Sequence, residues 1–144
     1  MKEKLTKLEA FDAMAKFLEG YYERTKSNDF GSLLSDMLYS SEGCTSDPAA
    51  WTNWSNSVNT VLNETSKAYQ NNMHEKLTKL QAFSAMRKFL EIYYEQTTHS
   101  DDVGTLLSGM NFLSDGGTVD PAAWENWTKC VNDIQKKNNE STAA

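Results

Sequence analysis

Catalysis or metal binding would need suitably placed histidine, cysteine or carboxylate side chains, and this sequence offers few of them. The two histidines, His74 and His99, belong to no recognisable ligand or catalytic motif, so we interpret them as ordinary exposed residues. The two cysteines, Cys44 and Cys130, fall in an expected loop and an expected helix, and we expect both to be free thiols without a catalytic role. The sequence therefore predicts a protein that is not an enzyme and that carries no metal or cofactor.

Acidic residues are the chemical feature that stands out, because two long segments contain them without any Lys or Arg. The first, from Ser27 to Ser66, holds Asp29, Asp36, Glu42, Asp47 and Glu64. The second, from Ser100 to Thr128, holds Asp101, Asp102, Asp115, Asp120 and Glu125. We expect both segments to carry a negative field.

Two interpretations of these carboxylates stay open. Helix capping and solubility explain some of them, and Asp47 and Asp120, each followed by Pro, are best explained as caps. The functional interpretation is an acidic surface that steers a basic partner into contact, formed by Asp36, Glu42, Asp101, Asp102 and Asp115. A less favoured alternative is a metal-dependent hydrolase, which requires Asp101 or Asp102 to approach Asp115 or Asp120 around a pocket.

The net charge of −6 argues against nucleic acid as a partner, since such binding depends on neutralising phosphates with Lys and Arg. No stretch has the eighteen or so apolar residues that a membrane-spanning helix needs, and the charged N-terminus does not resemble a signal peptide. We therefore expect no membrane partner and a cytoplasmic location.

An internal duplication determines where these residues lie. The segment EKLTKLEAFDAMAKFLEGYYERT from Glu3 matches EKLTKLQAFSAMRKFLEIYYEQT from Glu75 at an offset of 72 residues. After one inserted residue near Ser100 the offset becomes 73, and DPAAWTNWSNSV from Asp47 then matches DPAAWENWTKCV from Asp120. We assign one helical repeat to residues 1–72 and a second to residues 73–144.

Each repeat contains three segments with helical periodicity. In the first repeat these are a long helix over about 3–24, a short one from Phe30 that Asp29 would cap, and a third that begins at Asp47 and Pro48. The apolar stripes of the first two helices include Leu8 and Leu38. No segment shows the alternation of a strand, and residues 63–72 fit either a polar linker or a continued helix. We predict an all-α fold of about six helices, as two pseudo-symmetric three-helix repeats in a compact bundle or a short solenoid.

The aromatic residues fall into two groups. Trp51, Trp54, Trp124 and Trp127 have the i, i+3 spacing of a helix face, so we expect core packing and not a ligand site. The tyrosines are adjacent pairs, and neighbouring helix residues point about 100° apart. We therefore expect Tyr22 and Tyr94 to be partly exposed partner-binding anchors.

The block EKLTKLQAFSAMRKFLEIYYEQT, followed by DDVGTLLSGM and DPAAWENWTKCV, resembles small immunity proteins of enterobacterial contact-dependent growth inhibition and related polymorphic toxin systems. The resemblance implies a cytoplasmic protein, monomeric when free, that binds and neutralises a cognate toxin domain. Such a toxin is commonly a nuclease, and we favour a ribonuclease over a deoxyribonuclease. The alternative is a helical-repeat adaptor or regulatory protein without a toxin partner.

Overall fold

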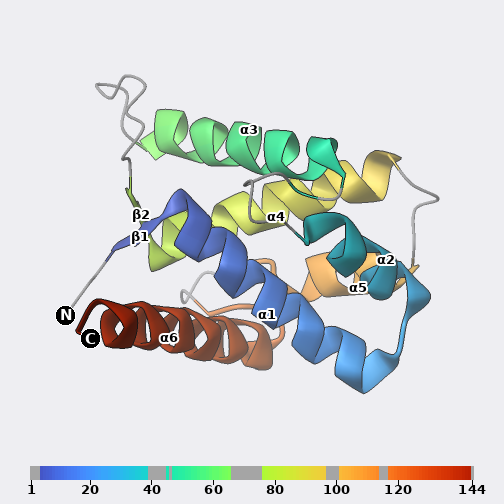
Figure 1. Cartoon of the computed structure of the whole chain (residues 1–144). Helices are drawn as coiled ribbons and strands as arrows, with labels where there is room; N and C mark the ends of the chain where they lie inside the picture. Colours follow the sequence, from blue (N-terminus) through green and yellow to red (C-terminus); the bar gives the residue numbers. More distant parts are fainter. Residues whose placement is uncertain are drawn as a thin grey trace.

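The chain folds into six helices and one short pair of strands, shown in a computed structural model that describes residues 4–38, 45, 47–65, 76–96, 101–113 and 117–143. This confirms the all-α prediction (Figure 1). The elements are β1 (Lys4–Thr6), α1 (Lys7–Thr25), α2 (Asn28–Met37), α3 (Pro48–Thr65), β2 (Lys76–Thr78), α4 (Lys79–Gln96), α5 (Asp101–Gly109) and α6 (Pro121–Ala143).

The strands were not expected from the sequence. β1 and β2 pair antiparallel, with the fully buried Leu5 opposite Leu77. The first helix therefore begins at Lys7 and not near Glu3, because Thr6 adopts an extended conformation and caps it. Thr6 Oγ1 accepts from Glu9 N at 3.0 Å, and Thr6 N donates to Glu9 Oε1 at 2.9 Å. Three residues are too few for the alternation by which a strand is recognised in a sequence.

The starts of the third helices are confirmed, whereas the predicted cap of the second helix is wrong. Asp47 Oδ1 accepts from Ala49 N, and Asp120 Oδ1 accepts from Ala122 N, both at 3.0 Å. The N-cap of α2 is Ser27, whose side chain accepts from Asp29 N at 3.2 Å. Serine and aspartate cap helices about equally well, so the periodic pattern could not choose between neighbouring candidates.

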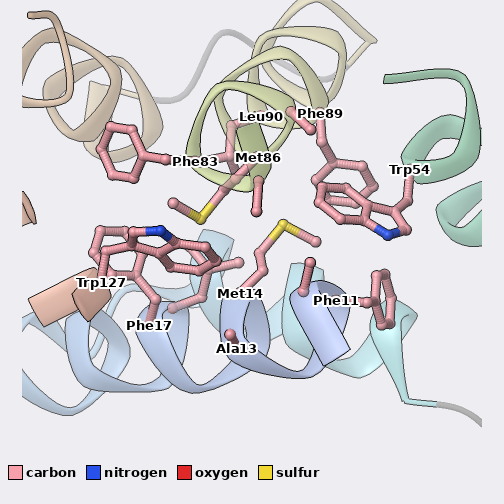
Figure 2. Packing of buried hydrophobic residues seen from close by; sticks show 14 of the residues in the cluster. Phe11, Ala13, Met14, Phe17, Trp54, Phe83, Met86, Phe89, Leu90 and Trp127 are labelled. Carbon is pink, nitrogen blue, oxygen red and sulfur yellow. The ribbon is translucent and has the colours of Figure 1, made fainter. Parts of the chain in front are cut away.

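One hydrophobic core contains residues of both repeats, and the tryptophans pack in it as predicted. Trp54 and Trp127 are fully buried, while Trp51 and Trp124 are partly buried against the same core. Figure 2 shows two aromatic groups with a pair of methionines between them: Phe17, Phe83 and Trp127 on one side, Phe11, Phe89 and Trp54 on the other, and Met14 and Met86 in the middle. Each such side chain contributes roughly 1.5–3 kcal/mol by leaving water.

Most residues of the predicted apolar stripes lie in this core, but some residues at the ends of the stripes are exposed. Leu8 is 46% exposed and Leu38 66% exposed, although both belonged to predicted stripes. Phe17 is buried outside its predicted stripe, because α1 packs against α6 as well as against α2 and α3. A helix covered on several sides buries more than one stripe.

The third helix of each repeat lies along the first helix of the other repeat. Figure 1 shows α3 running beside α4, and α6 beside α1, with α2 and α5 in contact at one end. Helix α3 ends at Thr65, so residues 63–65 of the questioned junction are helical, and residues 66–72 lie outside the described part of the chain. Within that part, no helix is long and apolar enough to cross a membrane.

Candidate interaction surface

The contact between α2 and α5 brings the acidic segments of the two repeats together. Ser27, which is buried, donates its hydroxyl to Asp102 Oδ2 at 2.7 Å while it caps α2. Asp29 and Asp102 both lie in the first turn of their helices, where the helix dipole stabilises a negative charge. One serine hydroxyl therefore joins the two short helices and holds one of the predicted carboxylates.

Two hollows lie beside this contact, the first lined by α2, α4 and the start of α3, and the second by α1, α2, α5 and the residue that caps α6. The first hollow, of about 260 Å³, is lined by Leu33, Asp36, Asp47, Ala49, Ala50, Asn53, Phe89 and Tyr93. The second hollow, of about 180 Å³, is lined by Tyr21, Thr25, Phe30, Asp102, Thr105, Leu106, Gly109 and Asp120. Half of the lining positions correspond at the repeat offset: Leu33 matches Leu106, Asp36 matches Gly109, Asp47 matches Asp120 and Tyr93 matches Tyr21.

The lining of the first hollow contains two aspartates and no Lys or Arg. Burial, together with the nearby charge of Asp47, raises the pKa of Asp36 above the ordinary value of an aspartate. Burial and the charges of Asp36 and Asp29 likewise raise the pKa of Tyr93. Tyr93 Oη also lies 3.5 Å from the carbonyl oxygen of Asp29, so it ties α4 to the start of α2. The carboxylates, and not a basic residue, set the field in this hollow.

The second hollow is also lined by two aspartates, Asp102 and Asp120, although Gly109 stands where the first repeat has Asp36. Burial and the charge of Asp120 raise the pKa of Tyr21, whereas Arg24, whose guanidinium lies 4.5 Å from the Tyr21 ring centre, lowers it. A Cβ at Gly109 would lie 3.1 Å from Asp120 Cβ, so this position has little room for a second carboxylate. Each hollow therefore has two aspartates and a tyrosine in its lining, and the second also has Arg24 beside its tyrosine.

The predicted acidic residues have different positions in this arrangement. Asp36 lines the first hollow, Asp102 lines the second, and Asp101 is exposed beside Asp102 in the first turn of α5. Glu42 and Asp115 lie outside the described residues. From the sequence, Asp47 and Asp120 were correctly assigned as helix caps. That they also line the hollows was missed, because capping already explained both residues.

Tyr22 and Tyr94, the predicted anchors, are half-buried against the second helix of their own repeat. A Cβ at Gly31 would lie 3.1 Å from Tyr22 Cε1, and one at Gly104 would lie 3.3 Å from Tyr94 Cε1. The two glycines therefore make room for the tyrosine rings. The other tyrosine of each pair, Tyr21 or Tyr93, reaches a hollow instead. A role of Tyr22 and Tyr94 in binding stays a prediction.

A larger hollow, of about 380 Å³, lies elsewhere, between α3 and α4. Its lining contains charged side chains of both signs, and all of them belong to α4. Arg87 of α4 forms an ion pair with one of these, Glu91, at 3.2 Å. It is lined by Asn56, Ser57, Thr60, Lys88, Glu91, Ile92 and Glu95. Because this hollow has no dominant charge and no feature that selects a ligand, its greater volume does not make it the better candidate.

The side chains considered for catalysis or metal binding are the cysteines, the histidines and two aspartates. Cys130 is a free thiol, as predicted, and burial raises its pKa to about 11, so at neutral pH it is a poor nucleophile. Cys44, His74 and His99 lie outside the described residues. Asp102 and Asp120 do meet at one hollow, as the hydrolase alternative requires, but the described residues contain no group of three or more metal-ligating side chains.

Comparison with protein-family models, with curated protein sequences and with solved structures found no match to this chain. The functional interpretation therefore depends on the residues and on the geometry described above.

Proposed function

We propose that this chain binds a basic protein domain through an acidic surface around the α2–α5 contact. The carboxylates of this surface are Asp29, Asp36, Asp47, Asp101, Asp102 and Asp120. The observation that carries the proposal is that these groups come from two segments without Lys or Arg, and that four of them line the two hollows: Asp36, Asp47, Asp102 and Asp120. Arg24, in the last turn of α1, lies beside Tyr21 of the second hollow, with its guanidinium 4.5 Å from the ring centre.

The first hollow suits a single basic side chain of the partner. A guanidinium pairs well with carboxylates and stacks on aromatic rings, and Asp36, Asp47 and Tyr93 offer both kinds of contact. In the free protein the ionised form of Asp36 is disfavoured by burial and by the charge of Asp47. A bound cation would attract both carboxylates and so favour the ionised form of Asp36.

The function that fits this surface is that of an immunity protein, which acts in the cytoplasm by covering the active site of a toxin domain. A nuclease binds the phosphates of its substrate in a basic cleft, and carboxylates can occupy such a cleft in place of phosphates. We favour a ribonuclease toxin. This proposal combines the acidic surface with the resemblance of the sequence to immunity proteins.

The test is co-expression with the C-terminal domain of the effector encoded beside the gene, with capture of that domain and survival of the cells both scored. Asp36→Lys and Asp101→Lys are compared singly with Asp133→Lys, which makes the same change of charge at an exposed position on α6. Asp102 is avoided because its carboxylate accepts from Ser27.

We expect the first two variants to weaken binding at least tenfold and to reduce its salt dependence, while Asp133→Lys binds like the parent protein. Helicity by circular dichroism should be equal in all three. If the toxin domain is captured with equal affinity by every variant, the acidic surface is not the binding site. If no domain is captured and no cells survive, the adaptor alternative replaces the immunity function.

A further inference from the structure

The two repeats contact each other reciprocally. The Trp54 ring lies 6.2 Å from Phe89 of the second repeat, and the Trp127 ring lies 6.2 Å from Phe17 of the first. Phe17 corresponds to Phe89, and Trp54 to Trp127, at the repeat offsets. A contact of residue i with residue j that is matched by one of j with i is the signature of an interface between two copies related by a twofold axis.

The strand pair shows the same relation. Leu5 lies directly opposite Leu77, and these are the same residue of the two repeats. Antiparallel pairing of a segment with its own copy places a local twofold axis between the two leucines. The only partner that each strand has among the described residues is thus the other repeat's strand.

Each third helix completes the core of the other repeat. Helix α3 packs chiefly along α4, and α6 chiefly along α1, whereas the contacts of α3 with α1 of its own repeat include Lys7 and Phe11, near the start of α1. There Trp54 Nε1 donates to the carbonyl of Lys7 at 3.1 Å, and in the second repeat Trp127 Nε1 donates to Lys79 at 3.0 Å. Each tryptophan therefore holds its own first helix and packs on the opposite one.

We propose that the chain is a covalently joined form of a twofold dimer, in which neither repeat is a folding unit by itself. The buried face of each first helix is an interaction surface whose partner is a second copy of the repeat, supplying its third helix and its strand. The segment 66–75 joins the repeats along the chain, but the contacts that hold the fold are those between the repeats. This proposal is independent of the proposed function.

The test is a cut between the repeats in the folded, full-length protein, at a protease site inserted in segment 66–75. The uncut protein with the same insertion is the matched control. We expect the two halves to elute together at the mass of the uncut protein in gel filtration. We also expect the thermal midpoint of the cut protein to fall by roughly 3–5 °C for each tenfold dilution, because folding now requires association.

The midpoint of the uncut control should not change with concentration. Two halves that elute separately, each with its helical content, would overturn the proposal. A cut protein whose midpoint is the same at every concentration would overturn it as well, because each repeat would then be folding alone.

Discussion

In the first hollow the carboxylates of Asp36 and Asp47 line the same space as Tyr93. Asp47 has a structural role, because its side chain caps α3. The side chain of Asp36 has no comparable role in holding the helices, and its pKa is raised by burial and by Asp47. A charge that is unfavourable in the free protein is a feature of binding sites more than of structural positions.

The first prediction is that Asp36→Asn stabilises the free protein at neutral pH. A raised pKa in the folded state means that the protonated form favours folding, and this contribution is lost as pH rises through the folded pKa. The variant should therefore gain at most about 0.5 kcal/mol at pH 7, because solvent screens the pair. The gain should disappear below about pH 4, where aspartate is protonated in the unfolded chain as well.

Denaturant unfolding at several pH values measures this effect. The control is the same substitution in an Asp47→Asn background, since Asn caps a helix about as well as Asp but removes the neighbouring charge. The gain in stability from Asp36→Asn should be smaller in that background. A loss of stability on Asp36→Asn at pH 7 would mean instead that the Asp36 carboxylate makes a favourable contact in the folded protein.

At the scale of the helices, local signals in the sequence were the most informative. Periodicity located all six helices, and Asp47 before Pro48 located the start of α3. The strand β1 was missed, although the Thr6 to Glu9 spacing of a capping box indicates that α1 begins only after Thr6. A stripe tells which face of a helix is buried but not which helix covers it, so the packing of α3 on α4 could not be predicted.

The same limit applies to the candidate site. The absence of Lys and Arg from the two segments indicated an acidic surface, and Asp36 and Asp102 do line hollows. Their partners could not be predicted, because Asp36 meets Tyr93 and Ser27 meets Asp102 only through contacts between the repeats. Such contacts depend on how the helices pack and leave no pattern in the sequence.

The second prediction concerns the capping boxes that start α1 and α4. Thr6→Ala leaves Glu9 N without its acceptor, and Thr78→Ala does the same for Gln81 N. Each change should lower the free energy of unfolding by about 1 kcal/mol. The measurement is denaturant unfolding followed by circular dichroism.

Thr60→Ala is the matched control for these two variants. Thr60 is exposed in the interior of α3, and its hydroxyl donates to the carbonyl of Asn56. Alanine has the higher helix propensity, so this change should be neutral or slightly stabilising. A loss at Thr60 equal to that at Thr6 would show that the effect belongs to threonine side chains in general and not to the caps.

At the scale of the whole molecule, the shared core determines how the repeats respond to a local change. The buried cluster includes Met14 and Met86 from corresponding positions, and aromatic contacts cross between the repeats at Trp54 and Trp127. Loss of structure in one repeat would expose core residues of the other. The free energy of unfolding should therefore belong to the chain as a whole.

The third prediction follows from this coupling. The intact chain should unfold in one transition, with the same midpoint by tryptophan fluorescence and by circular dichroism. Thr6→Ala weakens a cap in the first repeat and Thr78→Ala weakens its counterpart in the second, and each should shift the whole transition without splitting it. Independently folding repeats would instead give two transitions, of which only the one that belongs to the altered repeat moves. Because the tryptophans lie in both repeats, fluorescence would detect such a split directly.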